Sequence, residues 1–221
     1  MRTAVVIGSS GLIGQQLVEK LAQEGSWSSV LAITRKNSIW NSPKIRNLRF
    51  DFINWADLEM QIQAFGGGRG IDFFCCLGTT IKQAKSEAAF KKIDLEAVVL
   101  FSKLASRCRA EQLIVVSAMA ADANSSVFYN RVKGEMEQAV PKEFSGKIHF
   151  MRPSLLLGDR KEFRFAERVA ILLAPIYASL IPVKYKPILA SCVAKAMVAL
   201  ATKKATGDLI VDNAEMHQIC G

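Results

Sequence analysis

The chain has 221 residues, of which 50% are hydrophobic and 22% are charged, and its formal net charge is +9. This length and composition predict one soluble globular domain, residues 1–221, with a substantial buried core. The basic residues occur singly or in pairs, interleaved with acids and without the aromatic-basic motif of single-strand binders, so we expect no nucleic-acid partner. The longest uncharged stretch, 169–183, contains prolines and is shorter than the roughly 18 to 20 apolar residues of a membrane span, so we expect no transmembrane segment.

The cysteines and histidines bear on the compartment and on metal binding. The five cysteines form no C-x-x-C pair, and a strand begins too close to Met1 for a signal peptide to precede it. We therefore expect a cytoplasmic protein without a disulfide framework. The two histidines, His149 and His217, are far apart and neither lies at metal-ligand spacing to a cysteine, so no metal site is predicted.

Apolar runs of strand length alternate along the chain with amphipathic segments of helix length. The predicted strands are Ala4–Ile7, Val30–Thr34, Arg46–Phe50, Asp72–Leu77, Leu113–Ser117, Ile148–Met151 and Leu209–Val211. The predicted helices are Leu12–Gln23, Trp55–Ala64, Ser86–Arg107, Tyr129–Ala139, Phe163–Ser179 and Leu189–Thr202. The alternation predicts an α/β fold, a doubly wound parallel sheet of the Rossmann type with helices on both faces. Residues from about 154–190 are expected to form a small C-terminal cap on the substrate side.

A glycine-rich turn follows the first predicted strand. Its residues are Gly8, Ser9, Ser10, Gly11, Leu12, Ile13 and Gly14. Gly8 permits a tight turn, Gly11 lets the backbone approach a pyrophosphate, and Gly14 lets the following helix pack closely on the strand. A pyrophosphate there would meet free backbone N–H groups and the positive end of the helix dipole. The turn predicts a dinucleotide site, and the alternative is a merely tight strand-to-helix turn.

The end of the second predicted strand distinguishes between dinucleotides. NAD-specific sites usually place an Asp or Glu there to bind the ribose 2′-hydroxyl, whereas this chain has Arg35 and Lys36. Arg35 would bind a 2′-phosphate in a bidentate fashion, and Lys36 would add positive charge. The sequence therefore predicts NADPH (NADP) as the cofactor, unless Arg35 is an ordinary solvated arginine at a strand end.

Three polar residues form a candidate catalytic set downstream of the cofactor turn. Tyr129 and Lys133 are four residues apart at the start of a predicted helix, so they share one helical face. A tyrosine is a poor acid/base at neutral pH unless a nearby cation favours its phenolate, and Lys133 would supply that charge and hold the nicotinamide ribose. Ser117, at the end of the preceding strand, would hydrogen-bond the substrate oxygen.

Together these motifs resemble those of the atypical short-chain dehydrogenase/reductases over essentially the whole chain. The resemblance rests on Gly8-Ser9-Ser10-Gly11 with Gly14, Cys75-Cys76-Leu77-Gly78-Thr79-Thr80, Tyr129-x-x-x-Lys133-Gly134-Glu135, Arg152-Pro153-Ser154-Leu155-Leu156-Leu157 with Asp159-Arg160, and the Asp212-Asn213 to His217 segment.

The resemblance implies a Rossmann fold that binds NADPH, and it adds further site residues. The implied contacts are Leu77, Gly78 and Thr79 under the adenosine ribose, Asp51 and Phe52 beside adenine, and Pro153, Ser154 and Leu155 beside nicotinamide. Asp94 occupies the position where many relatives carry the Asn of a catalytic tetrad, and it would orient Lys133 through water.

Two functions of different classes are compatible with these residues. The first is an NADPH-dependent oxidoreductase acting on an unidentified carbonyl or alcohol, with Tyr129, Lys133 and Ser117 handling the proton and the oxygen. The second, favoured by what the resemblance implies about partner binding, is a catalytically weak NADPH-binding regulator that acts through a protein partner. A nucleotide-sugar epimerase is a weaker alternative because the C-terminal portion is short. The apolar and aromatic composition of residues 163–185 suggests a small hydrophobic substrate, although core packing explains it equally well.

Overall fold

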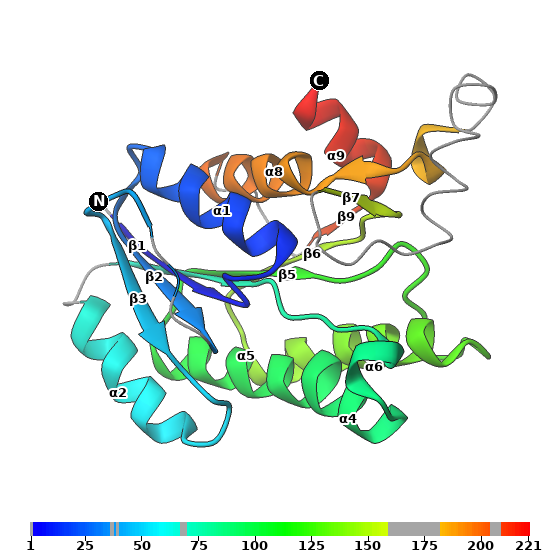
Figure 1. Cartoon of the computed structure of the whole chain (residues 1–221), viewed down its shortest axis with the longest axis horizontal. Coiled ribbons are helices and arrows are strands. Elements are labelled where there is room, and N and C mark those ends of the chain that lie inside the picture. Colours follow the sequence, from blue (N-terminus) through cyan, green and yellow to red (C-terminus); the bar gives the residue numbers. More distant parts are fainter. Residues whose placement is uncertain (1, 36–37, 39, 67–69, 159–181, 204–208) are drawn as a thin grey trace.

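The computed structural model describes residues 2–35, 38, 40–66, 70–158, 182–203 and 209–221. Its central sheet contains all seven predicted strands in the order β3-β2-β1-β4-β5-β6-β9, and every pair of neighbours is parallel (Figure 1). The strands are β1 (Arg2–Ile7), β2 (Trp27–Thr34), β3 (Ile45–Arg49), β4 (Ile71–Cys75), β5 (Gln112–Val116), β6 (Lys147–Met151) and β9 (Leu209–Val211). The predicted boundaries are right to within a few residues, and the prediction of a Rossmann-type α/β fold is confirmed.

Helices cover both faces of the sheet, which explains why the inner strands are nearly continuous runs of buried residues. One face packs against α1 (Leu12–Gln23), α8 (Ala190–Lys203) and α9 (Asn213–Cys220). The other face packs against α2 (Trp55–Gly66), α5 (Ala97–Arg107) and α6 (Phe128–Glu143), as Figure 1 shows. Alternate residues of β1 point into the two cores: Val6 faces α1 and α8, whereas Val5 faces α2 and α5.

The helix predicted at Ser86–Arg107 is not uniform. It begins at the Ser86 cap, whose hydroxyl accepts a hydrogen bond from the Ala89 N–H, and runs through α4 (Glu87–Lys91). A π-helical turn, η1 (Lys92–Glu96), then separates α4 from α5. A π turn inserts one residue into the α-helical repeat, and such turns are frequent at functional sites. Here the π turn contains the buried Asp94.

Short elements complete the described part of the chain. A four-residue helix, α3 (Ile81–Ala84), follows β4, and a 3₁₀ turn, η2 (Val183–Tyr185), precedes α8. Two-residue strands β7 (Leu156–Leu157) and β8 (Ile188–Leu189) pair in parallel. These strands fall within the range predicted for the cap, whereas the helix predicted at Phe163–Ser179 lies outside the described residues.

The sequence predicts no disulfide framework, and the described residues contain one isolated disulfide that it did not predict. Cys192 on α8 and Cys220 at the end of α9 are joined by a disulfide, with their Cα atoms 5.2 Å apart. Spacing could not reveal this pair, because the two cysteines are 28 residues apart and meet only when α9 packs on α8. The disulfide ties the C-terminal helix to the sheet-covering helix α8.

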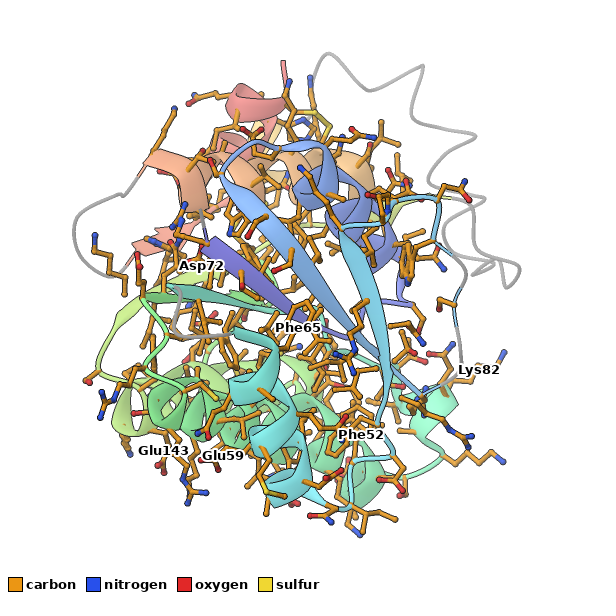
Figure 2. The ribbon with its side chains drawn as sticks, turned by 90° about the vertical axis from the view of Figure 1, so that its left-hand side faces the viewer. Phe52, Glu59, Phe65, Asp72, Lys82 and Glu143 are labelled. Atoms are coloured by element: carbon orange, nitrogen blue, oxygen red, sulfur yellow. A yellow bond between two sulfur atoms is a disulfide. The ribbon has the colours of Figure 1, made fainter. Side chains whose placement is uncertain are left out.

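A buried carboxylate, Asp72, anchors the amino-terminal end of the sheet. It accepts hydrogen bonds from Trp27 Nε1 at 2.7 Å and Gln112 Nε2 at 2.9 Å, and pairs with Arg2 Nη1 at 3.0 Å. Burial raises the pKa of Asp72 above its ordinary value, although these donors and the Arg2 charge oppose that effect. Figure 2 shows Asp72 and Phe52 toward opposite ends of the sheet, so this network is remote from the strand ends where the candidate site lies.

We expect Asp72→Asn to lower the free energy of unfolding by about 2–4 kcal/mol. An amide has one acceptor oxygen, so at least one buried donor loses its partner and Arg2 loses its counter-charge. Chemical denaturation measures the difference, with the exposed Asp57→Asn as the matched control, for which the change should stay below about 1 kcal/mol. Equal stabilities of the two variants would show that the Asp72 network does not hold this end of the sheet together.

Candidate functional site

A groove crosses the carboxyl ends of the parallel strands where the strand order reverses between β1 and β4. The register aligns these ends, because Ile7 of β1 lies opposite Ile33 of β2 on one side and Cys75 of β4 on the other. Open α/β sheets bind ligands in such a crevice. Two cavities occupy it, of about 540 Å³ and about 710 Å³. They share lining residues and so form one continuous groove: Ser10, Gly11, Cys76, Leu77, Gly78, Thr79 and Gln83.

The glycine turn brings three backbone segments into close contact. Gly8 has a φ of +75°, and an added Cβ would lie 2.6 Å from the Cys76 carbonyl carbon. An added Cβ on Gly14 would lie 2.2 Å from the Gly8 carbonyl oxygen, so α1 can pack this closely only with glycine there. Gly11 has an extended conformation and caps α1 without a side-chain hydrogen bond. The first N–H groups of α1 therefore meet the groove uncapped, as an anion site requires.

Ser9 differs from the other residues of the turn. Its side chain is fully buried, and its hydroxyl donates a hydrogen bond to the Ile33 carbonyl oxygen at 2.8 Å. Ser9 therefore joins the turn to β2 and does not direct its hydroxyl into the groove, whereas Ser10 is exposed and lines both cavities.

The larger cavity contains the residues expected beside adenosine. Arg35, Asp51 and Phe52 all line it, and Lys36 lies outside the described residues. Phe52 has a φ of +68°, a strained conformation for a bulky side chain. Its ring packs against Phe50 and Trp55, with centroids 5.3 and 6.1 Å away, and forms an aromatic wall. Sequence reasoning missed Trp55 as part of this wall.

The smaller cavity contains all three candidate catalytic residues, Ser117, Tyr129 and Lys133. The Ser117 hydroxyl is buried and has no hydrogen-bond partner among the described residues, so it is available to a ligand oxygen. The Tyr129 ring is partly buried and packs against Phe90 at 5.6 Å. Gly134 allows α6 to approach the loop after β5, since an added Cβ would lie 2.0 Å from the Ala123 nitrogen.

Lys133 forms a buried ion pair with Asp94. The Lys133 Nζ atom lies 2.8 Å from Asp94 Oδ1, and the two side chains are 3% and 0% exposed. Asp94 Oδ2 accepts a hydrogen bond from the Thr79 N–H at 2.9 Å. The contact with Lys133 is therefore direct and not through water as expected. Burial opposes the charged form of Lys133, but the Asp94 carboxylate and Tyr129 outweigh it and raise the pKa of Lys133 above its ordinary value.

The segment Pro153–Leu155 forms one wall of the smaller cavity. A residue of the C-terminal helix α9 holds this segment in place. Asn213, the first residue of α9, accepts a hydrogen bond from the Ser154 N–H at 3.0 Å. Its amide group donates to the carbonyl oxygens of Val183 and Lys186. Asn213 is fully buried and joins three segments beside the site. The sequence carried only a weak signal for this role, in the closing Asp-Asn motif.

The described residues include no cluster of three or more His, Cys, Asp or Glu side chains that could hold a metal ion. In the same residues, no helix combines the length and the hydropathy that crossing a bilayer requires.

Comparison with known proteins identifies relatives of this fold and sequence. The model of the NAD dependent epimerase/dehydratase family matches residues 4–170. The chain is 29% identical to Protein HTATIP2 of Rattus norvegicus over 170 aligned residues. The aligned residues make up 76% of this chain and 69% of that protein. This chain is 31% identical over 160 residues to "Protein FMP52, mitochondrial" of Candida albicans, with coverages of 71% and 68%. The Bordetella bronchiseptica enzyme WbmG in complex with NAD shares the fold, with a TM-score of 0.71 at 13% identity over 99% of this chain and 76% of that chain.

We expect Gly11→Val to abolish measurable NADPH binding while leaving the fold intact. The φ of −75° at Gly11 suits any residue, and an added Cβ would lie 3.2 Å from the Gly8 carbonyl oxygen, a tight contact that a shift of the turn by a few tenths of an ångström relieves. Because Gly11 lines both cavities, the branched side chain would occupy the groove. Calorimetric titration with NADPH measures the loss. Gly25→Val is the control, since no atom lies within 4 Å of its added Cβ. Undiminished affinity in Gly11→Val would place the ligand elsewhere.

Proposed function

The chain belongs to the NAD-dependent epimerase/dehydratase family, and from that premise we propose that it is an NADPH-dependent oxidoreductase acting on a carbonyl or alcohol. The observation that carries the proposal is the placement of Ser117, Tyr129 and Lys133 in one cavity continuous with the glycine turn. The fit to a dinucleotide rests on the uncapped start of α1, the glycine cradle and the unpartnered Ser117 hydroxyl.

Each member of the set has a role that its environment supports. Bound NADPH would supply the hydride. Tyr129 would exchange a proton with the substrate oxygen, and Ser117 would hydrogen-bond that oxygen from its buried position. Lys133 would remain charged beside Tyr129, held by Asp94, and would hold the nicotinamide ribose.

The preference for NADPH over NADH rests on Arg35. The side chain is exposed at the end of β2 and lines the larger cavity beside Phe52. Asp51 lines the same cavity, but one of its oxygens already accepts a hydrogen bond from the Ile53 N–H at 3.0 Å. A guanidinium in this place suits a 2′-phosphate better than a 2′-hydroxyl.

The substrate would be a small molecule with an apolar part, since leucine and proline residues form one wall of the smaller cavity beside the polar set. A cytoplasmic location stays a prediction. The name of the Candida albicans relative places that protein in mitochondria.

We expect Arg35→Ala to weaken NADPH binding roughly ten- to a hundred-fold and to leave NADH binding unchanged, because a charge-assisted contact to the 2′-phosphate is lost. Calorimetric titration of the wild type and of Arg35→Ala with NADPH and with NADH measures the four affinities. Lys44→Ala, which removes one positive charge just before the amino-terminal end of β3, controls for the general basic charge of the protein. Equal affinities of the wild type for NADPH and NADH would contradict the proposed preference.

We expect Tyr129→Phe to keep NADPH affinity and to lose about 10²–10⁴-fold in turnover, because the proton donor is removed without loss of ring packing. The measurement is NADPH oxidation with a broad panel of aldehydes and ketones, followed by kinetics on any that react. A Tyr129→Phe variant as active as the wild type would remove this residue from the chemistry. Absence of wild-type turnover on every substrate, with protein binding that depends on NADPH, would instead favour the regulatory function.

A further inference from the structure

We propose that the Cys192–Cys220 disulfide is a redox switch: its reduction by a dithiol releases α9 and loosens the Pro153–Leu155 wall of the smaller cavity. The inference concerns the structure of this wall, and its effect on cofactor binding rests on the proposed function. It assigns thiol–disulfide exchange to a site outside both cavities of the groove.

Of the five cysteines, Cys192 and Cys220 are the pair suited to exchange, because they are joined and both are partly exposed. The other three are free thiols. Burial raises the pKa of Cys75 to about 12 and that of Cys108 to about 11, and it likewise raises the pKa of the Cys76 thiol, so these groups stay protonated at neutral pH. In a reducing compartment such as the predicted cytoplasm, isolated disulfides are usually transient and redox-sensing.

The two helices decide which sulfur leaves when a thiolate attacks the disulfide. Cys192 is the third residue of α8, where the helix dipole stabilises a thiolate, whereas Cys220 is the last residue of α9, where the dipole has the opposite sign. A thiolate of the dithiol therefore attacks the Cys220 sulfur, and the electron pair of the S–S bond goes to Cys192. The second thiol then attacks the sulfur of its own molecule and releases Cys220. Two electrons and two protons pass to the cysteines, and the reagent leaves with an internal disulfide.

One side of α9 connects the disulfide to the wall of the smaller cavity. Asn213, Met216 and Cys220 are separated by three and four residues, so they lie on the same side of the helix. Asn213 accepts the hydrogen bond from the Ser154 N–H, and Met216 is fully buried in the same core as α8. The helix therefore has one anchor on the wall, one in the core and one covalent anchor on α8.

The covalent anchor matters because α9 is short. It has eight residues, and helices of this length are marginal without tertiary contacts. The hydrogen bond from Lys195 Nζ to the Cys220 carbonyl oxygen, at 2.8 Å, is exposed and holds this end weakly. Reduction also opens the loop that the disulfide closes between cysteines 28 residues apart, so local opening of α9 becomes more frequent.

Opening of α9 reaches the wall through Asn213. Its amide group donates to the Lys186 carbonyl oxygen at 2.8 Å, and the Ser154 hydroxyl donates to the same oxygen at 2.5 Å. When Asn213 moves away, the Ser154 N–H loses its acceptor and the Lys186 carbonyl oxygen loses one of its two donors. The wall is then held less firmly beside the place proposed for the nicotinamide.

Hydrogen exchange tests the switch in the whole protein. Thiol titration of the denatured chain should first give three free thiols before reduction and five after it. Mass spectrometry of the peptide that contains Ser154 then compares air-oxidised wild type with wild type in dithiothreitol. We expect exchange there to be about ten-fold faster after reduction, and exchange in the core strand β5 to be unchanged.

Two variants serve as controls. Cys108→Ser, which removes a thiol outside the pair, should respond to dithiothreitol as the wild type does. The double variant Cys192→Ser/Cys220→Ser should exchange fast at Ser154 with and without dithiothreitol. If the double variant does not fold, the comparison of oxidised with reduced wild type decides alone. Five free thiols before reduction, equal exchange at Ser154 in both states, or the same acceleration in β5 would overturn the inference.

Calorimetric titration of both states with NADPH and with adenosine 2′,5′-bisphosphate, which represents the adenosine half alone, measures the effect on the cofactor. We expect reduction to weaken NADPH binding roughly ten-fold, because fewer molecules have the wall in place, and to leave bisphosphate binding unchanged. Equal affinities of the two states for NADPH would overturn the inference. Absence of NADPH binding in either state, with the exchange as expected, would count against the proposed function alone.

Discussion

The close backbone contact between the glycine turn and the end of β4 is the constraint on which the site depends. With side chains at Gly8 or Gly14, α1 and the loop after Cys76 could not approach as they do. Their approach sets the groove at the point where the strand order reverses and leaves the start of α1 facing it without a cap. The aromatic wall at Phe52 and the candidate catalytic residues then line two cavities that share Leu77–Thr79.

A second contact, between Asp94 and Lys133, links this shared floor to α6, the helix that carries two of the candidate catalytic residues. The ion pair crosses from η1 to α6, and the same carboxylate accepts a hydrogen bond from the Thr79 N–H, so the floor of the groove and the helix that carries these candidate catalytic residues share one buried group. Removing one partner of a buried ion pair leaves an uncompensated buried charge, which strongly destabilises the fold. The stability of this end of the molecule and the charge state of its site are therefore set together.

Sequence patterns predicted the sheet, the glycine turn and the Tyr129–Lys133 face because each depends on local spacing: the period of a strand, the freedom of glycine and the pitch of a helix. The features they missed depend on tertiary packing. The π turn around Asp94 lies where η1 packs on α6, and the Cys192–Cys220 disulfide forms where α9 packs on α8. The Ser9 hydroxyl likewise points away from the groove, because it donates a hydrogen bond to the Ile33 carbonyl oxygen on β2.

The central claim is that one dinucleotide spans the groove from Phe52 to Tyr129, with its pyrophosphate at the start of α1. A crystal structure of the chain grown with NADPH tests it most directly. The account predicts adenine against the Phe52 wall, the 2′-phosphate at Arg35, and the nicotinamide in the cavity lined by Ser117 and Tyr129. A dinucleotide bound outside the groove, or bound with its nicotinamide against Phe52, would contradict the account.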